Sequence, residues 1–293
     1  MSPGGRAEGV ARLRRVIAKI ELEAGRPSDR LARRLPFARA FDSALSGGLA
    51  DDALHEIAPA RPADGAAAMG FALALAARFL SQRPWPALAL VIGEGFAAEE
   101  SGALYGPGLV AHGVALSRLV FVRAPDAALA FWAIEEALKC GAPAVVVGEI
   151  WSLKGYSLAA SRRLVLAARK GKVPALLILA SAYGQAERLS SAAETRFEIA
   201  AAPSATIPAT AGPDLPGPFA CGARLVKARF ARAGPEAPSQ PFDARRVIRL
   251  EWRSQDMIFK DMTFKDMAVD DQAISFPLAA ASGDRSRAAA WRY

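Results

Sequence analysis

Short apolar runs alternate with helix-like segments between residues 41 and 202, and this alternation constrains the fold more than any other feature of the chain. Three of the runs, residues 87–92, 142–147 and 175–180, are continuously apolar, as are strands that helices cover on both faces. Residues 127–139 separate two of these runs and carry apolar residues at helical spacing. Strands and helices in this order predict an α/β fold with a parallel sheet flanked by helices.

The first strand–loop–helix unit, residues 41–92, has the layout of a phosphate-binding unit but lacks its motif. After a Gly-Gly turn and a strand, the loop reads APARPADGAA over residues 58–67. RecA-type ATPases, which this layout resembles, have G-x-x-x-x-G-K-[ST] there, with a lysine that reaches the phosphates and a hydroxyl that binds Mg²⁺. Both are absent here, and the degenerate loop, with Pro59 and Gly65, places Asp64 where phosphate would approach.

The other elements of such an ATPase site are also degenerate. The acidic position that binds Mg²⁺ should end the run AVVV, but the chain has Gly148 there, and Glu149 falls on the opposite face of the strand. Glu94 lies near the position of the catalytic glutamate. After the strand 175–180 the chain has Ser181 in place of the usual Asn or Gln of the sensor position. We therefore expect no catalytic residue, no metal, no cofactor and no enzymatic activity, with weak nucleotide binding as the alternative.

Composition and spacing divide the chain into five segments. Apolar residues at helical spacing among arginines indicate a helix near the N-terminus, and Pro and Gly become frequent after residue 202. Alternating apolar and basic residues then indicate an antiparallel hairpin. The segments are a basic N-terminal helix and linker (1–40), a RecA-like core with the degenerate loop (41–202), a linker (203–222), a small C-terminal β extension (223–281) and a flexible tail (282–293).

The net charge of +8 is unevenly distributed. Residues 41–150 carry a net charge of −6, whereas the segments on either side are basic. Such asymmetry suits nucleic acid or an acidic protein partner. The candidate contacts lie on and just after one predicted helix, and the alternative is an ordinary solvated helix face. They are Arg162, Arg163, Arg169, Lys170 and Lys172.

Large apolar residues gather near the C-terminus, around the repeat DMIFK–DMTFK. We expect them to lie outside the core and to contact a partner, because aromatic residues and methionine are enriched at interfaces. The alternative is a β-hairpin packed on its own domain. These candidate partner contacts are Trp252, Met257, Phe259, Met262 and Phe264.

Several stretches, taken in order, resemble one family. They are SGGLADDALHEI, LYGPGLVAHGVALSRLVFVRA, WAIEEALKCGAPAVVVGEI, LAASRRLVLAARKGKVPALLIL and SSAAETRF. Together they resemble ImuA, the RecA-like accessory proteins of damage-induced (SOS) mutagenesis in bacteria, over roughly residues 41–200. The resemblance implies a non-catalytic adaptor in translesion DNA synthesis that assembles with an ImuB-like polymerase-related protein and an error-prone DnaE-type polymerase. No catalytic residue is carried over.

Other partners and roles remain open at this point. The alternatives are a regulator of RecA filaments and a SulA-like inhibitor of cell division, and DNA is a further possible partner. Arg78 and Arg83 interrupt or bound the best apolar stretch, so we expect no membrane span of ~20 residues. The first residues lack the apolar stretch of a secretory signal, and the two cysteines lie far apart. We expect a cytoplasmic protein that is nucleoid-associated when acting.

Overall fold

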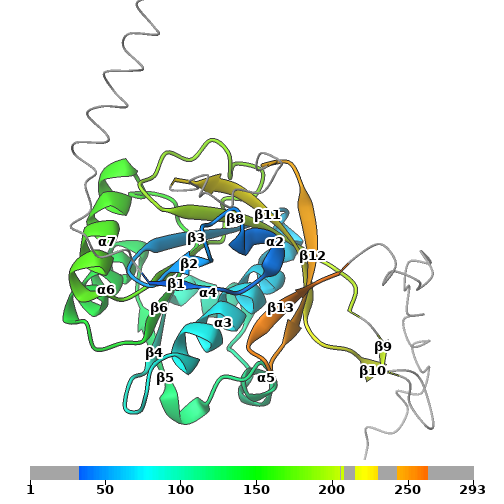
Figure 1. Cartoon of the computed structure of the whole chain (residues 1–293). Helices are drawn as coiled ribbons and strands as arrows, with labels where there is room; N and C mark the ends of the chain where they lie inside the picture. The colour runs from blue at the N-terminus through cyan, green and yellow to red at the C-terminus, as the bar shows by residue number, and fades with distance from the viewer. Residues whose placement is uncertain (1–32, 205, 208–214, 230–242, 263–293) are drawn as a thin grey trace, which may run out of the picture. The chain divides into compact units, whose positions relative to one another are not determined.

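A nine-stranded sheet forms the centre of the protein (Figure 1). The computed structural model describes residues 33–204, 206–207, 215–229 and 243–262. The strand order is β13-β12-β11-β8-β3-β7-β6-β4-β5. The strands are β3 Leu54–Pro59, β4 Ala89–Glu94, β5 Leu119–Ala124, β6 Val145–Ile150, β7 Ala175–Leu179, β8 Thr195–Ala201, β11 Ala220–Ala228, β12 Val247–Arg253 and β13 Ile258–Asp261.

The sheet has a parallel part and an antiparallel part. The strands from β8 to β5 pair in parallel, and β11, β12 and β13 add antiparallel strands beyond β8. The predicted fold class is thereby confirmed. Two small two-stranded sheets accompany the main one. They are β1 Arg34–Leu35 with β2 Leu49–Ala50, and β9 Thr206–Ile207 with β10 Leu215–Pro216.

Helices cover both faces of the parallel part. Helix α3 packs on one face, against one apolar cluster. Helices α6 and α7 pack side by side on the other face and share a second apolar cluster. Side-chain oxygens of Asp126 and Ser157 cap α6 and α7, accepting hydrogen bonds from the backbone N–H groups of Leu129 and Ala160 at 2.8 and 3.2 Å. The helices are α2 Arg39–Asp42, α3 Gly65–Ser81, α4 Gly95–Ser101, α5 Gly106–Ala111, α6 Ala127–Cys140 and α7 Leu158–Gly171, with 3₁₀ turns η1 Pro62–Asp64 and η2 Leu116–Arg118.

One helical stretch among the described residues, Pro62–Ser81, has the length and mean hydropathy of a membrane-spanning helix. Within the protein, 67% of its most apolar window is buried, so its composition is that of a core helix. Arg78, which we expected to interrupt any such stretch, lies inside it and donates from Nε to the backbone oxygen of Pro36 at 3.0 Å.

The C-terminal strands belong to the same core as the parallel sheet. Trp252 and Phe259 are each 2% exposed, and their rings lie 4.9 Å apart. Phe259 also stacks on Phe71 of α3, with ring centroids 5.2 Å apart. The expectation that these two residues lie outside the core is therefore wrong. The reason is that β13 pairs with β12 and receives the segment around Phe37, whose backbone oxygen accepts a hydrogen bond from the N–H of Phe259.

The predicted segment boundaries differ from the structure at two places. Residues 34–40, which we expected to belong to the N-terminal linker, contain β1 and the start of α2, and Leu35, Phe37 and Ala38 are buried in the core. Strand β11 begins at Ala220, inside the range 203–222 that we expected to be a linker. Its N-terminal part already pairs with β8 and β12, so chain that looks linker-like in composition is part of the sheet. The predicted N-terminal helix and the tail 282–293 lie outside the described residues.

A buried ion pair joins the two central strands β3 and β8. Glu56 and Arg196 lie opposite each other in the sheet, are 0% and 2% exposed, and are joined by a bond of 2.6 Å between Arg196 Nε and Glu56 Oε2. The guanidinium also donates to the backbone oxygens of Ala186 and Leu189, and the hydroxyl of Tyr156 donates to the other oxygen of Glu56. Such a cluster is costly to disrupt, because removing one partner leaves an unpaired charge in the core.

We expect Arg196→Met to lower the free energy of unfolding by about 3–5 kcal/mol, measured by urea denaturation followed by circular dichroism. The double variant Glu56→Leu with Arg196→Met removes both charges and should recover part of this loss. Arg188→Met, at an exposed arginine, is the control. If Arg196→Met costs no more than the control, the pair does not hold the strands.

Buried His55 gives stability a pH dependence. Its Nδ1 lies 2.8 Å from Thr195 Oγ1 and its Nε2 2.9 Å from the backbone oxygen of Ala50, and burial lowers the pKa of the imidazole. The unfolded chain therefore binds a proton at a pH where the folded chain does not, starting near about pH 6.5. This contribution is present at higher pH and is lost as pH falls, by up to about 1.4 kcal/mol per pH unit.

We expect His55→Gln to remove that slope in the free energy of unfolding between about pH 7 and pH 5. Burial raises the pKa of Asp42 to about 6, which stabilises the fold as pH falls and so acts in the opposite direction. The measurement is therefore the difference in slope between the two proteins. Equal slopes would contradict the assignment of a neutral imidazole in the fold.

Candidate functional site

The degenerate loop lies at the edge of the sheet where its parallel strands end. Strand β3 ends at Pro59, the turn η1 follows, and α3 begins at Gly65. In open α/β sheets, ligands bind beyond the carboxyl ends of the strands, and phosphate binds at the N-terminus of the helix that follows. This is the place where a nucleotide would have to bind.

The carboxylate of Asp64 is buried and accepts hydrogen bonds from neighbouring residues. The side chain is 1% exposed and accepts hydrogen bonds from the backbone N–H of Arg61 at 3.0 Å and from Arg61 Nε and Nη2 at 3.0 and 3.1 Å. It also accepts from the backbone N–H of Ala201 at the end of β8, at 3.0 Å. The hydrogen bonds from Arg61 lower the pKa of this carboxyl. A negative charge therefore already lies at the N-terminus of α3, where a phosphate would be attracted.

The loop also lacks the donors that a phosphate needs. Pro59 and Pro62 have no backbone N–H. The positions equivalent to the lysine and the hydroxyl residue are Ala66, which is exposed, and Ala67, which packs in the core. The methyl side chains of these two alanines can neither donate a hydrogen bond to a phosphate nor hold Mg²⁺.

The magnesium-binding position is filled by the opposite helical layer. A Cβ atom added at Gly148 would lie 2.4 Å from Cδ1 of Ile134 on α6 and 3.0 Å from Cδ1 of Leu177 on β7. Real Cβ atoms do not approach other atoms so closely, so an aspartate at 148 would require the side chain of Ile134 to move. The neighbouring Glu149 is half-buried and accepts a hydrogen bond of 3.3 Å from the indole N–H of Trp151, and burial raises the pKa of its carboxyl.

Glu94 and Ser181 hold the backbone that follows β6. The carboxylate of Glu94 is buried and accepts hydrogen bonds from the backbone N–H groups of Trp151 and Ser152 at 2.9 and 3.1 Å. The hydroxyl of Ser181 donates to the backbone oxygen of Trp151. Both positions, which an ATPase would use for catalysis and sensing, thus stabilise a loop in this protein.

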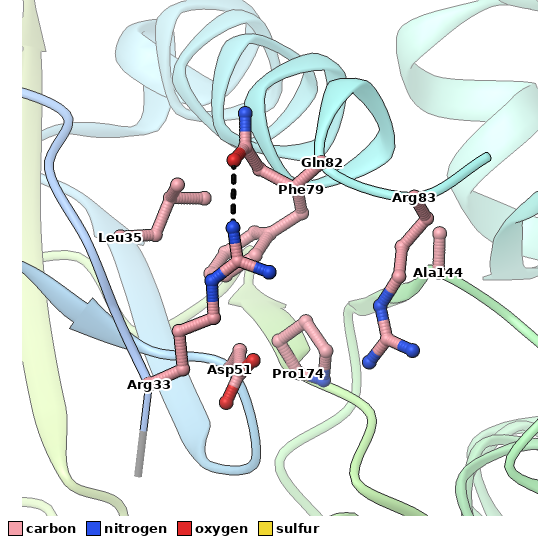
Figure 2. Close-up of a pocket in the computed structure, with 8 residues that line it drawn as sticks. All are labelled: Arg33, Leu35, Asp51, Phe79, Gln82, Arg83, Ala144 and Pro174. Carbon is pink, nitrogen blue, oxygen red and sulfur yellow. Dashed lines mark hydrogen bonds between the residues drawn. The ribbon is translucent and has the colours of Figure 1, made fainter.

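A second concave site on the described surface is too small for a nucleotide. The pocket in Figure 2 lies among Arg33, Asp51, Phe79 and Arg83, near the opposite ends of the strands, and its volume of about 10 Å³ is that of one water molecule. Arg33 donates from Nη2 to Gln82 Oε1 across it at 2.9 Å. Among the described residues, no three His, Cys, Asp or Glu side chains are grouped to hold a metal ion.

The predicted basic contacts form one exposed surface along α7. Arg162, Arg163, Arg169, Lys170 and Lys172 are all exposed. Arg163 forms an ion pair with Glu135 of α6, while no ion pair to a described residue is formed by the other four. Arg169 and Lys170 lie in the last turn, where cations also stabilise the helix dipole.

The predicted C-terminal contacts do not form a surface. Beside the buried Trp252 and Phe259, Met257 is partly buried against the core and Met262 is half-buried. Phe264 lies outside the described residues. Sequence reasoning instead missed a hollow between α6 and α7 beside the exposed Trp132. A tryptophan on the polar side of a predicted helix was the signal that could have indicated it.

Comparison with solved structures gives many likenesses, among them the two described below. No family model and no curated protein matches the chain. The crystal structure of the RadB recombinase aligns with a TM-score of 0.46 and 17% identity, over 77% of this chain and 98% of that one. The crystal structure of SulA from Pseudomonas aeruginosa aligns with a TM-score of 0.34 and 26% identity, over 43% of this chain and 96% of that one. Neither likeness reaches a TM-score of 0.5, so the assignment of an α/β fold with a largely parallel sheet rests on the strand order and helical layers of this chain.

We expect Asp64→Ala to lower the free energy of unfolding by about 1–3 kcal/mol, because it leaves two backbone N–H groups without an acceptor. Arg61→Ala should cost about 0–1 kcal/mol, since Arg61 is 70% exposed. Urea denaturation of both variants measures the difference. Equal losses would mean that the ion pair, rather than the hydrogen bonds to the backbone, holds the loop.

Proposed function

We propose that this protein is a non-catalytic, RecA-like adaptor in damage-induced translesion DNA synthesis. The observation that carries the non-catalytic part is the filled nucleotide site. Asp64 takes the place of a phosphate, and Ile134 takes the space of the magnesium-binding aspartate. A site that has a carboxylate at the phosphate position and lacks the lysine and the magnesium ligand is without the groups that phosphoryl transfer requires.

The partners follow from the resemblance of the sequence to ImuA. They are an ImuB-like polymerase-related protein and an error-prone DnaE-type polymerase. Two properties of the described surface support a role in binding: the exposed basic side chains of α7 and the large apolar side chains left exposed on α6 and α7. Exposed apolar residues beside a charged rim are typical of protein–protein contact surfaces. The proposed place of action is the cytoplasm, at the nucleoid.

The first test is co-purification of the full-length chain with the ImuB-like protein from the same genome. We expect retention that is unchanged when ATP and Mg²⁺ are added or when EDTA replaces them, because the nucleotide site is filled. A truncation ending at Met262 is the matched form, since it keeps all nine strands of the central sheet.

Retention of both forms supports an adaptor that binds through the part before residue 263, and retention of the full chain alone supports one that binds through the tail. No retention of either folded protein contradicts the proposal. RecA filament assembly and cell division are then the activities to assay, because the sequence leaves both as alternatives. Retention that requires ATP would contradict the proposal that the degenerate loop binds no nucleotide.

A further inference from the structure

The outer face of the helical pair α6–α7 has a hollow that does not include the degenerate loop. Its volume is about 240 Å³, below the range of about 300–1,000 Å³ typical of small-molecule sites. It is therefore suited to a side chain of a partner rather than to a cofactor. The hollow is lined by Phe131, Trp132 and Glu135 of α6 and by Ala160, Arg163 and Leu164 of α7.

Large apolar side chains remain exposed beside this hollow. Trp132 is 59% exposed on α6 and Leu166 is 57% exposed on α7. Arg163, Leu166 and Lys170 recur at i, i+3 and i+7, so they share one face of α7. Leu164 of the same helix is 2% exposed, which shows that the pair has buried other apolar side chains and left these two in solvent.

The net charge of these two helices is positive. Helix α7 has four basic residues and no acidic residue. The two glutamates of α6 are already paired, Glu135 with Arg163 and Lys139, and Glu136 with Lys139. Together the two helices carry five basic and two acidic residues, a net charge of +3. A second copy of the chain would bring like charges together on this face, whereas an acidic partner would be attracted to it.

We propose that the α6–α7 groove binds an acidic amphipathic helix of a partner protein, which inserts one large apolar side chain into the hollow beside Trp132. Its carboxylates would lie against Arg162, Arg163 and Lys170. This inference rests on the proposed adaptor function and names the chemistry of its contact. Helix-in-groove binding of this kind uses apolar anchors at i, i+3 or i+4 and i+7.

The ion pair between Arg163 and Glu135 does not prevent such binding. The side chain of Arg163 is 66% exposed, whereas that of Glu135 is 11% exposed. The guanidinium of Arg163 is therefore open to a carboxylate of the partner. Glu135 keeps Lys139, whose Nζ lies 2.8 Å from its Oε1.

The test is fluorescence anisotropy with the full-length chain and a labelled peptide of about 16 residues, long enough to form a helix. The peptide has leucine at every third or fourth position and glutamate at most others. A second peptide with lysine in place of glutamate and a single-stranded DNA oligonucleotide are the comparison probes. We expect the glutamate peptide to bind and the lysine peptide not to bind.

Two variants and a matched control locate the site. Trp132→Ala and the double variant Arg162→Glu with Arg163→Glu should each weaken binding of the glutamate peptide by about tenfold or more. Lys260→Glu changes an exposed residue of β13, at the other end of the sheet, and should leave binding unchanged. Unchanged thermal unfolding of Trp132→Ala verifies that the fold is intact, as its exposure leads us to expect.

Four results would overturn the proposal: no saturable binding of the glutamate peptide, equal binding of the lysine peptide, binding insensitive to Trp132→Ala, or tight DNA binding that depends on the arginines alone. The adaptor function is tested separately, by co-purification with the ImuB-like protein. If the variants are retained by the ImuB-like protein as well as the wild type, the adaptor stands and the groove is not its contact. If the wild type is not retained but binds the peptide, the groove stands and the adaptor function fails.

Discussion

The buried ion pair between Glu56 and Arg196 is the interaction on which the centre of the structure depends. Two charges in an apolar interior are tolerated only when their remaining hydrogen-bonding capacity is satisfied. Arg196 meets this condition by donating to the backbone oxygens of Ala186 and Leu189, so the turn between β7 and β8 is fixed together with the strands. The hydrogen bond from Ala201 to Asp64 extends the connection from β8 to the loop after β3. The position of the loop therefore follows from pairing that begins in the core.

The acidic residues near the loop stabilise backbone rather than serve chemistry. Asp64 accepts bonds from two backbone N–H groups and one guanidinium, and Glu94 accepts from the two N–H groups that follow β6. A carboxylate with its lone pairs so occupied has little capacity left for a metal or a substrate. The volume at Gly148 is also taken, by Ile134. Compared with the ATPase site that the sequence resembles, this loop differs by more than a lysine, and adding the motif residues alone would leave the carboxylate of Asp64 at the N-terminus of α3.

The sequence predicts the sheet well because its strands are buried on both faces and read as continuous apolar runs. The sequence predicts the C-terminal region less well. A hairpin has the same alternation of apolar and polar residues whether its apolar face is exposed or covered. The cover is distant in sequence: Phe71 and the segment at Phe37 pack on Phe259, and no local pattern joins them. For the candidate site, the absence of the lysine is evident from the sequence. The acceptor role of Asp64 toward Ala201 is not, because it depends on how β8 lies beside β3.

A filled nucleotide site changes how a RecA-like fold can use its surface. A ligand shifts a protein between states only through contacts that differ between those states. In the loop 58–67, the lysine and the hydroxyl residue that would contact a γ-phosphate are absent, and the carboxylate of Asp64 lies at the N-terminus of α3. The proposed binding face on α6 and α7 is then presented in one arrangement, held by the caps at Asp126 and Ser157 and by the packing of both helices on the sheet. A surface ordered before its partner arrives loses less entropy on binding, so modest contacts such as one aromatic anchor and a few charges can suffice for a specific complex.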